Sequence, residues 1–232
     1  MRIHGAQRNR SAAGREGFPR AGLPEFAFAG RSNVGKSSLL NALVRHRGLA
    51  RTSRSPGCTQ LVHFYEVNRK FLFADLPGYG YAKVPERVRA TWAPLVESYL
   101  LGRSPLRLVW VLVDSRHPPT ELDAHLVEWL RHERIPFRVA MTKSDRLSGN
   151  ERGKARRRCG EALGPVEEGL EPVLTSAKDG AGLPAVWQEI RDRLAAKKMD
   201  PENDPSLSRF PPSLEGSGHG STTHPAPSTK TE

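Results

Sequence analysis

The sequence predicts an α/β fold in three layers, with a mostly parallel six-stranded sheet and helices on both of its faces. Between Leu23 and about Lys198, short apolar runs alternate with amphipathic stretches, which is typical of repeated strand–helix units. Several runs are apolar almost throughout, as in strands covered on both faces, and Leu106–Val113 is the clearest of them. The third observation is a glycine-rich loop between the first apolar run and a helical pattern.

The expected strands are the six apolar runs Glu25–Ala29, Leu61–Val67, Lys70–Asp75, Leu106–Val113, Phe137–Thr142 and Pro172–Thr175. Only Asn68 and Arg69 separate the second run from the third, which is too short for a helical crossover. We therefore expect Leu61–Val67 to be the one antiparallel strand. Amphipathic patterns predict helices at Lys36–Arg45, Pro85–Leu101, Glu121–His132, Ser148–Leu163 and Leu183–Ala196.

The two ends of the chain differ in composition from the region between them. Residues 1–22 are basic and lack the apolar core of a secretory signal, so we expect a disordered arm there. Residues 199–232 are rich in Pro, Ser, Gly and Thr, and we expect a disordered tail. The folded domain is therefore expected over residues 23–198.

Composition narrows the class of protein. No apolar run approaches the roughly 18 residues that cross a bilayer, which argues against a membrane-spanning protein. The two cysteines, Cys58 and Cys159, lack the spacing of a disulfide framework or a zinc site and fit the cytoplasm. The net charge of +11 favours a polyanionic partner such as nucleic acid, although some basic proteins are merely soluble.

The glycine-rich loop GRSNVGKS matches the pattern G-x-x-x-x-G-K-[ST] without departure, which predicts a phosphate-loop NTPase fold. Backbone N–H groups of such a loop turn toward phosphates, and the helix N-terminus adds partial positive charge. We expect Lys36 to reach the terminal phosphates and the Ser37 hydroxyl to ligate Mg²⁺. The residues expected to contact phosphates are Gly30, Arg31, Ser32, Asn33, Val34, Gly35, Lys36 and Ser37.

A second element, DLPG, follows the third apolar run. Asp75 would hold Mg²⁺ through water, and Gly78 would let its backbone N–H approach the γ-phosphate of the nucleotide. The expected contacts are Asp75, Leu76, Pro77 and Gly78. Between the two motifs, Thr52 and Thr59 are both candidates to complete the metal shell. Thr59 is favoured because Pro56 and Gly57 set a turn before it, and the alternative is that both threonines lie in a solvated loop.

Two further motifs at strand ends predict that the base is guanine. The carboxylate of Asp145 can accept hydrogen bonds from guanine N1–H and its exocyclic amine, and the stem of Lys143 can cover the base plane. Backbone N–H groups of the TSAK segment can meet the guanine carbonyl oxygen. The alternative, a pair of polar turns, is weakened because both segments lie where α/β sheets bind ligands. The residues assigned to guanine are Thr142, Lys143, Ser144, Asp145, Thr175, Ser176 and Ala177.

Together GRSNVGKSSLLNAL, SRSPGCTQLVHFYEV, DLPGYGYAKV, MTKSDRLS and TSAKDGAG resemble the EngB family of bacterial GTPases, of the same branch as TrmE, Era and EngA. The resemblance covers roughly Leu23 to Ala196. It implies a role in assembly of the large ribosomal subunit, with that subunit or its rRNA as partner, and a link to cell division and septation. It also implies a cytoplasmic protein without a membrane partner that is monomeric away from the ribosome.

The resemblance also assigns residues. It implies that Gly57, Cys58, Thr59, Gln60 and Leu61 form a first switch, and that Ser37 and Thr59 hold Mg²⁺. Many relatives resemble SRTPGRTQ, so Cys58 stands where they have arginine. For GTP hydrolysis, the expected catalytic residues are Lys36, Asn33, Thr59 and Gly78.

Two points of mechanism stay open in the sequence. Tyr79 stands where many GTPases have a water-orienting glutamine, so hydrolysis is expected to be slow without an activating partner or cation. Asn33 matches an asparagine that coordinates K⁺ in some related GTPases, and the alternative is that it only shapes the loop.

The densest basic run is Arg152–Arg158, which either contacts rRNA or forms a solvated helix face. Two other classes of protein remain as alternatives. One is an ATP-dependent phosphate-loop enzyme, and the other is an RNA-binding scaffold that senses nucleotide with negligible turnover.

Overall fold

The computed structural model describes residues 2–20, 22–50, 61–79, 94–164 and 171–196. Contacts within the chain divide it into two units, Met1–Lys197 and Lys198–Glu232, and all of the described fold belongs to the first. The tail expected over 199–232 lies outside the described residues, as does the beginning of the helix expected at Pro85–Leu101.

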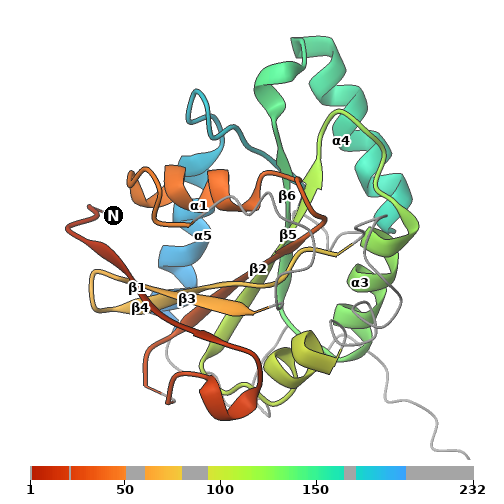
Figure 1. The fold of residues 1–232 in the computed structure, drawn as a ribbon. Helices are drawn as coiled ribbons and strands as arrows, with labels where there is room; N and C mark the ends of the chain where they lie inside the picture. Colours follow the sequence, from red (N-terminus) through yellow and green to blue (C-terminus); the bar gives the residue numbers. More distant parts are fainter. Residues whose placement is uncertain (1, 21, 51–60, 80–93, 165–170, 197–232) are drawn as a thin grey trace, which may run out of the picture. The chain divides into compact units, whose positions relative to one another are not determined.

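One seven-stranded sheet forms the middle layer, in the order β1-β3-β4-β2-β5-β6-β7 (Figure 1). Neighbours from β4 to β7 are parallel, while β3 runs antiparallel to both β4 and β1. The predicted α/β fold, its six strands and the single antiparallel strand are confirmed. The strands are β1 (Ala6–Ala12), β2 (Glu25–Gly30), β3 (Val62–Val67), β4 (Phe71–Asp75), β5 (Leu106–Asp114), β6 (Phe137–Thr142) and β7 (Val173–Leu174).

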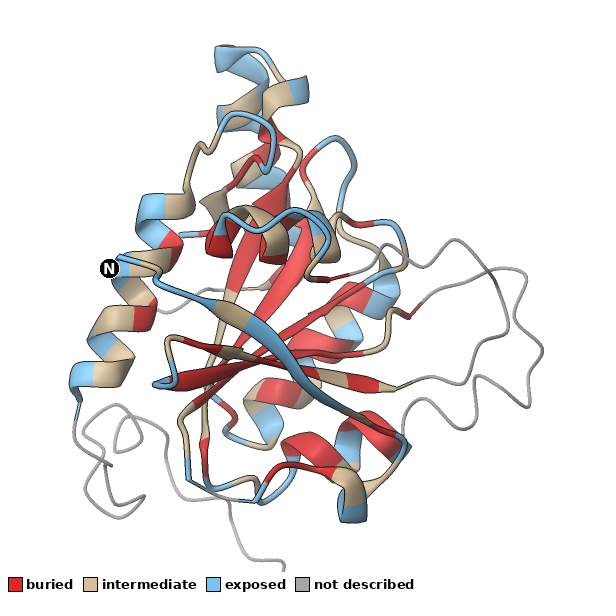
Figure 2. Cartoon of the chain, turned by 60° about the vertical axis from the view of Figure 1, so that its left-hand side comes forward, coloured by how far each residue is buried: buried red, intermediate tan, exposed pale blue. Residues whose placement is uncertain are grey.

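Helices cover both faces of the sheet, and side-chain alternation in the strands sends apolar groups to each of them. Phe26 and Phe28 of β2 point to the face covered by α1 (Lys36–Val44) and α5 (Leu183–Ala195). Ala27 and Ala29 point to the other face, which is covered by the helical segment 94–100, α3 (Glu121–His132) and α4 (Gly149–Leu163). Buried residues accordingly line the strands and the inner sides of the helices (Figure 2).

Helix boundaries follow from local capping chemistry. A capping box is present at the start of α4, where the Ser148 hydroxyl accepts from the Glu151 backbone N–H and Glu151 accepts from the Ser148 N–H. A second box, formed by Thr120 and Asp123, starts α3. Gly182 in the left-handed conformation precedes α5. Short 3₁₀ turns lie at η1 (Arg15–Gly17) and η2 (Ser144–Arg146).

The expectation of a disordered arm over residues 1–22 is wrong for most of that segment. Residues 6–12 form the edge strand β1, paired with β3 from Ala6 opposite Val67 to Ala12 opposite Val62. Further along, the ring of Phe18 is buried against Phe64 and Tyr99 at centroid distances of 5.9 and 5.4 Å. The physical reason for the miss is that β1 is held by backbone hydrogen bonds and keeps most side chains exposed, so it shows no apolar alternation.

Candidate nucleotide site

The predicted site residues gather at one edge of the sheet. β2, β4, β5 and β6 run parallel, and their carboxyl ends carry the phosphate loop, Asp75, Asp114 and Thr142 respectively. Ligands of open α/β sheets bind at this edge because the loops that follow neighbouring strands meet there. The topology thus brings together motifs that are more than a hundred residues apart in the sequence.

The phosphate loop connects β2 directly to α1. Gly30 is the last residue of β2, and Gly35, with φ of 108°, caps the start of α1 at Lys36. Asn33 also lies in the left-handed region, with φ of 63°, and the Val34 N–H donates to the Arg31 carbonyl at 3.1 Å. The loop therefore wraps around the N-terminus of α1, which is the arrangement expected of an anion-binding loop.

Lys36, the first residue of α1, forms an ion pair with Asp75, the last residue of β4. Both side chains are largely buried, 13% and 6% exposed respectively. Asp75 lies beside the start of α1, where Ser37 follows Lys36 in the first turn. The Ser37 hydroxyl and the Asp75 carboxylate are oxygen donors of the kind that Mg²⁺ prefers, so these residues fit the metal expected from the sequence.

The DLPG loop lies directly against the phosphate loop. The Ser32 N–H donates to the Tyr79 carbonyl at 2.9 Å, and Arg31 pairs with Tyr79 as an isolated parallel bridge. A Cβ at Gly78 would lie 3.1 to 3.2 Å from three atoms of Ser32, so a larger residue would push the two loops apart. Gly78 is thus close to the phosphate-binding backbone, as its predicted role requires.

The side chain of Tyr79 points away from a water-orienting position and into the protein. It is 6% exposed, and its hydroxyl donates to Asp123 Oδ1 of α3 at 2.8 Å. Burial raises the pKa of this phenol well above its ordinary value, and the charge of the hydrogen-bonded Asp123 raises it further. Tyr79 therefore stays neutral and connects the DLPG loop to α3. Sequence reasoning missed Asp123, which has no motif of its own.

The TKSD segment holds the middle of the phosphate loop. The Thr142 hydroxyl donates to the Val34 carbonyl at 2.6 Å, and Lys143 Nζ donates to the Asn33 carbonyl at 2.8 Å. Lys143 itself has φ of 60°, an uncommon conformation for a lysine. Its ammonium also lies 2.9 Å from Asp114 Oδ2 at the end of β5. The predicted base-binding and phosphate-binding segments are thus in direct contact.

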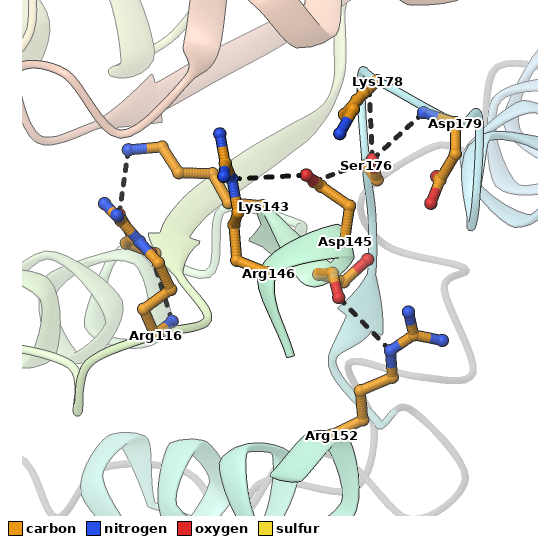
Figure 3. A network of polar contacts seen from close by, with 10 residues as sticks. Arg116, Lys143, Asp145, Arg146, Arg152, Ser176, Lys178 and Asp179 are labelled. Carbon is orange, nitrogen blue, oxygen red and sulfur yellow. Dashed lines mark hydrogen bonds and ion pairs between the residues drawn. The ribbon is translucent and has the colours of Figure 1, made fainter. Parts of the chain in front are cut away.

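The two segments assigned to guanine are joined to each other as well (Figure 3). Ser176 Oγ donates to Asp145 Oδ1 at 2.9 Å and accepts from the backbone N–H of Lys178 at 3.1 Å. The Ser144 N–H donates to the Thr175 carbonyl at 3.1 Å. These contacts hold the Asp145 carboxylate at a pocket of about 190 Å³ lined by Gly35, Ser38, Leu39, Thr142, Lys143, Asp145, Arg146, Thr175, Ala177 and Lys178.

Some predicted residues lie outside the described ranges. Of the proposed first switch, Gly57, Cys58, Thr59 and Gln60 fall in the undescribed residues 51–60, and Leu61 immediately precedes β3. The assignment of Thr59 to the metal and to catalysis therefore stays a prediction.

The basic run on α4 is more heavily paired than its sequence indicates. Arg152 Nε donates to the Ser144 carbonyl of the TKSD segment at 3.2 Å. Arg156 pairs with Glu171 at 3.0 Å, and Arg157 lies 3.7 Å from Glu161. Lys154 and Arg158 are exposed and have no ion pair among the described residues. Arg157 is 75% exposed and its contact with Glu161 is a weak surface pair, so a surface for a polyanion on α4 consists chiefly of Lys154, Arg157 and Arg158.

Three contributors to the site were not predicted. They are Asp114, Asp123 and the hydrogen bond from Arg152 to the Ser144 carbonyl. A signal existed for Asp114, because it closes the apolar run of β5 just as Asp75 closes that of β4. A carboxylate at the carboxyl end of a buried strand is placed for function in this class of fold. Among the described helices, none is long and apolar enough to cross a membrane.

Comparison with known proteins agrees with the geometry. A family model described as "50S ribosome-binding GTPase" matches residues 25–143. "Probable GTP-binding protein EngB" of Clostridium perfringens strain SM101 is 48% identical over 164 residues, covering 71% of this chain and 83% of that protein. The protein of the same name from Syntrophus aciditrophicus is 45% identical over 191 residues, covering 82% and 96%.

Solved structures share the fold at lower identity. A "probable GTP-binding protein engB" superposes with a TM-score of 0.62 and 22% identity, over 73% of this chain and 98% of that one. Era, solved "in complex with MgGDPNP and nucleotides 1506-1542 of 16S ribosomal RNA", superposes with a TM-score of 0.57 and 19% identity, over 78% and 60%.

Proposed function

Because this chain belongs to the EngB family of GTP-binding proteins and is a GTPase, we propose that it acts as a GTP-dependent switch in assembly of the large ribosomal subunit. The observation that carries the proposal is the match to the family model of 50S ribosome-binding GTPases, which runs from β2 through Lys143 and so includes both phosphate-binding motifs. A link to cell division and septation is also part of the proposal. We place the protein in the cytoplasm, monomeric away from the ribosome and without a membrane partner.

In this proposal the phosphate loop Gly30–Ser37 holds the phosphates, and Lys36 exchanges its partner Asp75 for the terminal phosphates when nucleotide binds. Asp75–Gly78 senses the γ-phosphate, because Gly78 lies against the backbone of Ser32. Ser37 and Thr59 would hold Mg²⁺, with Asp75 acting through water. When bound, the metal neutralises charge that develops on the phosphate oxygens during transfer.

Guanine is the base that the site fits best. Asp145 is held by Ser176 and lies at the pocket, where its carboxylate can accept from two adjacent donors on the base. Adenine presents no such pair of donors. This arrangement speaks against an ATP-dependent enzyme, whose binding would gain nothing from an ordered carboxylate at this position.

Hydrolysis should be slow in the isolated protein. Tyr79 lies where a catalytic glutamine would stand, and its hydroxyl is committed to Asp123 in the interior. Activation would then come from the ribosomal particle or from a cation, and K⁺ coordinated by Asn33 is the candidate. Faster turnover in K⁺ than in Na⁺ at equal ionic strength supports the cation, whereas equal rates exclude it.

The ribosomal role is tested by co-sedimentation of the full chain with large subunits in GTP, GDP and ATP. We expect binding that depends on guanine nucleotide, and hydrolysis that the subunit accelerates. Equal affinity for ATP and GTP, or no difference between nucleotide states, would contradict the proposal. Subunit binding without any hydrolysis would instead favour the scaffold that only senses nucleotide.

The α4 surface can be tested in the same assay. The double variant Lys154→Gln with Arg158→Gln should weaken subunit binding and flatten its salt dependence. Each cation removed from a phosphate lowers the slope of log affinity against log salt concentration by roughly one unit. The matched control is Arg69→Gln with Lys70→Gln, two exposed cations of the β3–β4 hairpin. An equal effect of both pairs would show that overall charge, and not α4, determines binding.

A further inference from the structure

Asp114 lies at the centre of a charge cluster that joins three loops of the site. It is the last residue of β5, and Arg116 donates to its carboxylate from the backbone N–H at 3.1 Å, from Nε at 2.9 Å and from Nη2 at 2.7 Å. On its other side Lys143 Nζ donates to Asp114 Oδ2 at 2.9 Å. Figure 3 shows the Lys143 and Arg116 side chains from their separate loops.

The carboxylate of Asp114 is well suited to hold a cation. Its side chain is only 18% exposed. Burial alone would raise its pKa, but the hydrogen bonds from Arg116 and Lys143 outweigh burial and hold the pKa well below its ordinary value. Asp114 is therefore ionised throughout the physiological pH range and presents a fixed negative charge to Lys143.

Lys143 needs such a partner. A free lysine side chain samples many rotamers, and fixing it in one of them costs conformational entropy. Its ammonium also donates to the carbonyl of Asn33, but a neutral carbonyl is a weaker acceptor than a carboxylate. With one acceptor in the phosphate loop and one at the end of β5, the ammonium is held at a point that lays the lysine stem along one wall of the pocket.

We propose that Asp114 is a positioning residue of the guanine site: it fixes the ammonium of Lys143 so that the lysine stem is preset to cover the base, and Arg116 in turn fixes Asp114. This inference rests on the proposed placement of guanine against Lys143 and Asp145. Asp114 touches no part of the nucleotide in this scheme, and its effect passes entirely through Lys143.

A double-mutant cycle on the full chain tests that dependence, with GDP affinity as the readout. Asp114→Ala should weaken GDP binding by about tenfold, the scale of one charge-assisted hydrogen bond. Lys143→Met keeps the apolar stem but removes the ammonium, so adding Asp114→Ala to it should change affinity by less than about twofold. Asp114→Asn retains one acceptor for Lys143 and should fall between wild type and alanine.

The opposite pattern overturns the proposal. If Asp114→Ala lowers GDP affinity by the same factor in wild type and in Lys143→Met, Asp114 only stabilises the turn after β5. No loss of affinity in either Asp114 variant also refutes it. Asp192→Ala on α5, which removes a carboxylate bonded to Gln188, is the matched control and should leave GDP binding unchanged.

The variant Asp145→Ala distinguishes a failure of this inference from a failure of the proposed guanine placement. If GDP binding survives Asp145→Ala undiminished, guanine does not lie where proposed, and the role of Asp114 is refuted with it. If Asp145→Ala abolishes GDP binding while Asp114→Ala has no effect, only the role of Asp114 is refuted. Weaker binding in both, with the effect of Asp114 dependent on Lys143, supports the two assignments together.

Discussion

Replacing Gly182 with alanine places a methyl group where the backbone of β7 already lies. Gly182 precedes α5 with φ of 72°, and a Cβ there would be 2.9 Å from the carbonyl carbon of Leu174, closer still to its oxygen, and 3.2 Å from Thr175 Cα. No side-chain rotation relieves such a contact, because the three nearest atoms all belong to the backbone. Either β7 or the start of α5 has to move.

The loss of stability caused by Gly182→Ala has two parts, and a second glycine of the chain provides a control that isolates one of them. An alanine in the left-handed region costs about 1 to 2 kcal/mol relative to glycine. Overpacking against backbone adds about 1 to 3 kcal/mol more. Gly180 also has positive φ, 82°, but a Cβ there would meet only Leu183 Cδ1 at 4.0 Å. Gly180→Ala should therefore show the first cost alone.

Thermal unfolding followed by circular dichroism measures both variants. For a domain of this size about 1 kcal/mol corresponds to roughly 2 to 4 °C, so Gly180→Ala should lower the Tm by roughly 2 to 8 °C and Gly182→Ala by roughly 4 to 20 °C. Gly182→Ala should also weaken GDP binding, because Leu174 and Thr175 lead directly into Ser176, which orients Asp145. Equal Tm values for the two variants would refute the backbone clash as the cause.

Three other changes have defined outcomes. Tyr79→Phe removes a buried hydrogen bond to Asp123 and should lower the free energy of unfolding by about 1 to 2 kcal/mol, while the GTP hydrolysis rate stays unchanged; a slower rate would show that the hydroxyl acts in catalysis. Arg103→Met strips a bidentate partner from Glu25, which is 1% exposed, and should cost about 3 to 5 kcal/mol in urea unfolding, against less than about 1 kcal/mol for Arg157→Met in the exposed pair with Glu161 on α4. Since the pKa of Asp114 is lower in the folded than in the unfolded protein, its contribution to stability is complete above the unfolded value near 3.8 and disappears as the pH falls through the folded value. The difference in unfolding free energy between wild type and Asp114→Asn should thus be constant between about pH 5 and 8 and shrink below about pH 4, and a decline that begins near neutral pH would contradict the assignment.

Much of the fold was predictable because its strands are buried on both faces. The runs in β2, β4, β5 and β6 are apolar almost throughout, and this pattern identifies strands of an α/β sheet without further information. The strand β1 was not predicted, for the opposite reason. In AQRNRSA the side chains stay at the surface, and pairing with β3 depends on backbone groups that every residue possesses.

The site shows the same division. The phosphate loop, DLPG, TKSD and TSAK were recognisable because each demands particular residue types at fixed spacing around a phosphate or a base. Asp114, Asp123 and Arg152 act on those motifs through contacts such as Arg152 with Ser144, which exist only once the chain has folded. The basic run of α4 is a similar case. Its charges look equivalent in the sequence, but in the structure Arg156 and Arg157 form ion pairs with Glu171 and Glu161.

The edge strand β1 affects how the protein should be handled. A chain shortened at residue 22, where the composition would put the domain boundary, would leave the β3 backbone without a partner along one side. An uncovered strand edge is a template for pairing with another chain, so such a truncation invites self-association, and it also removes the buried ring of Phe18 from beside Phe64 and Tyr99. The strand β1 thus protects the sheet from its own copies, and the oligomeric state should be measured on protein that retains this strand.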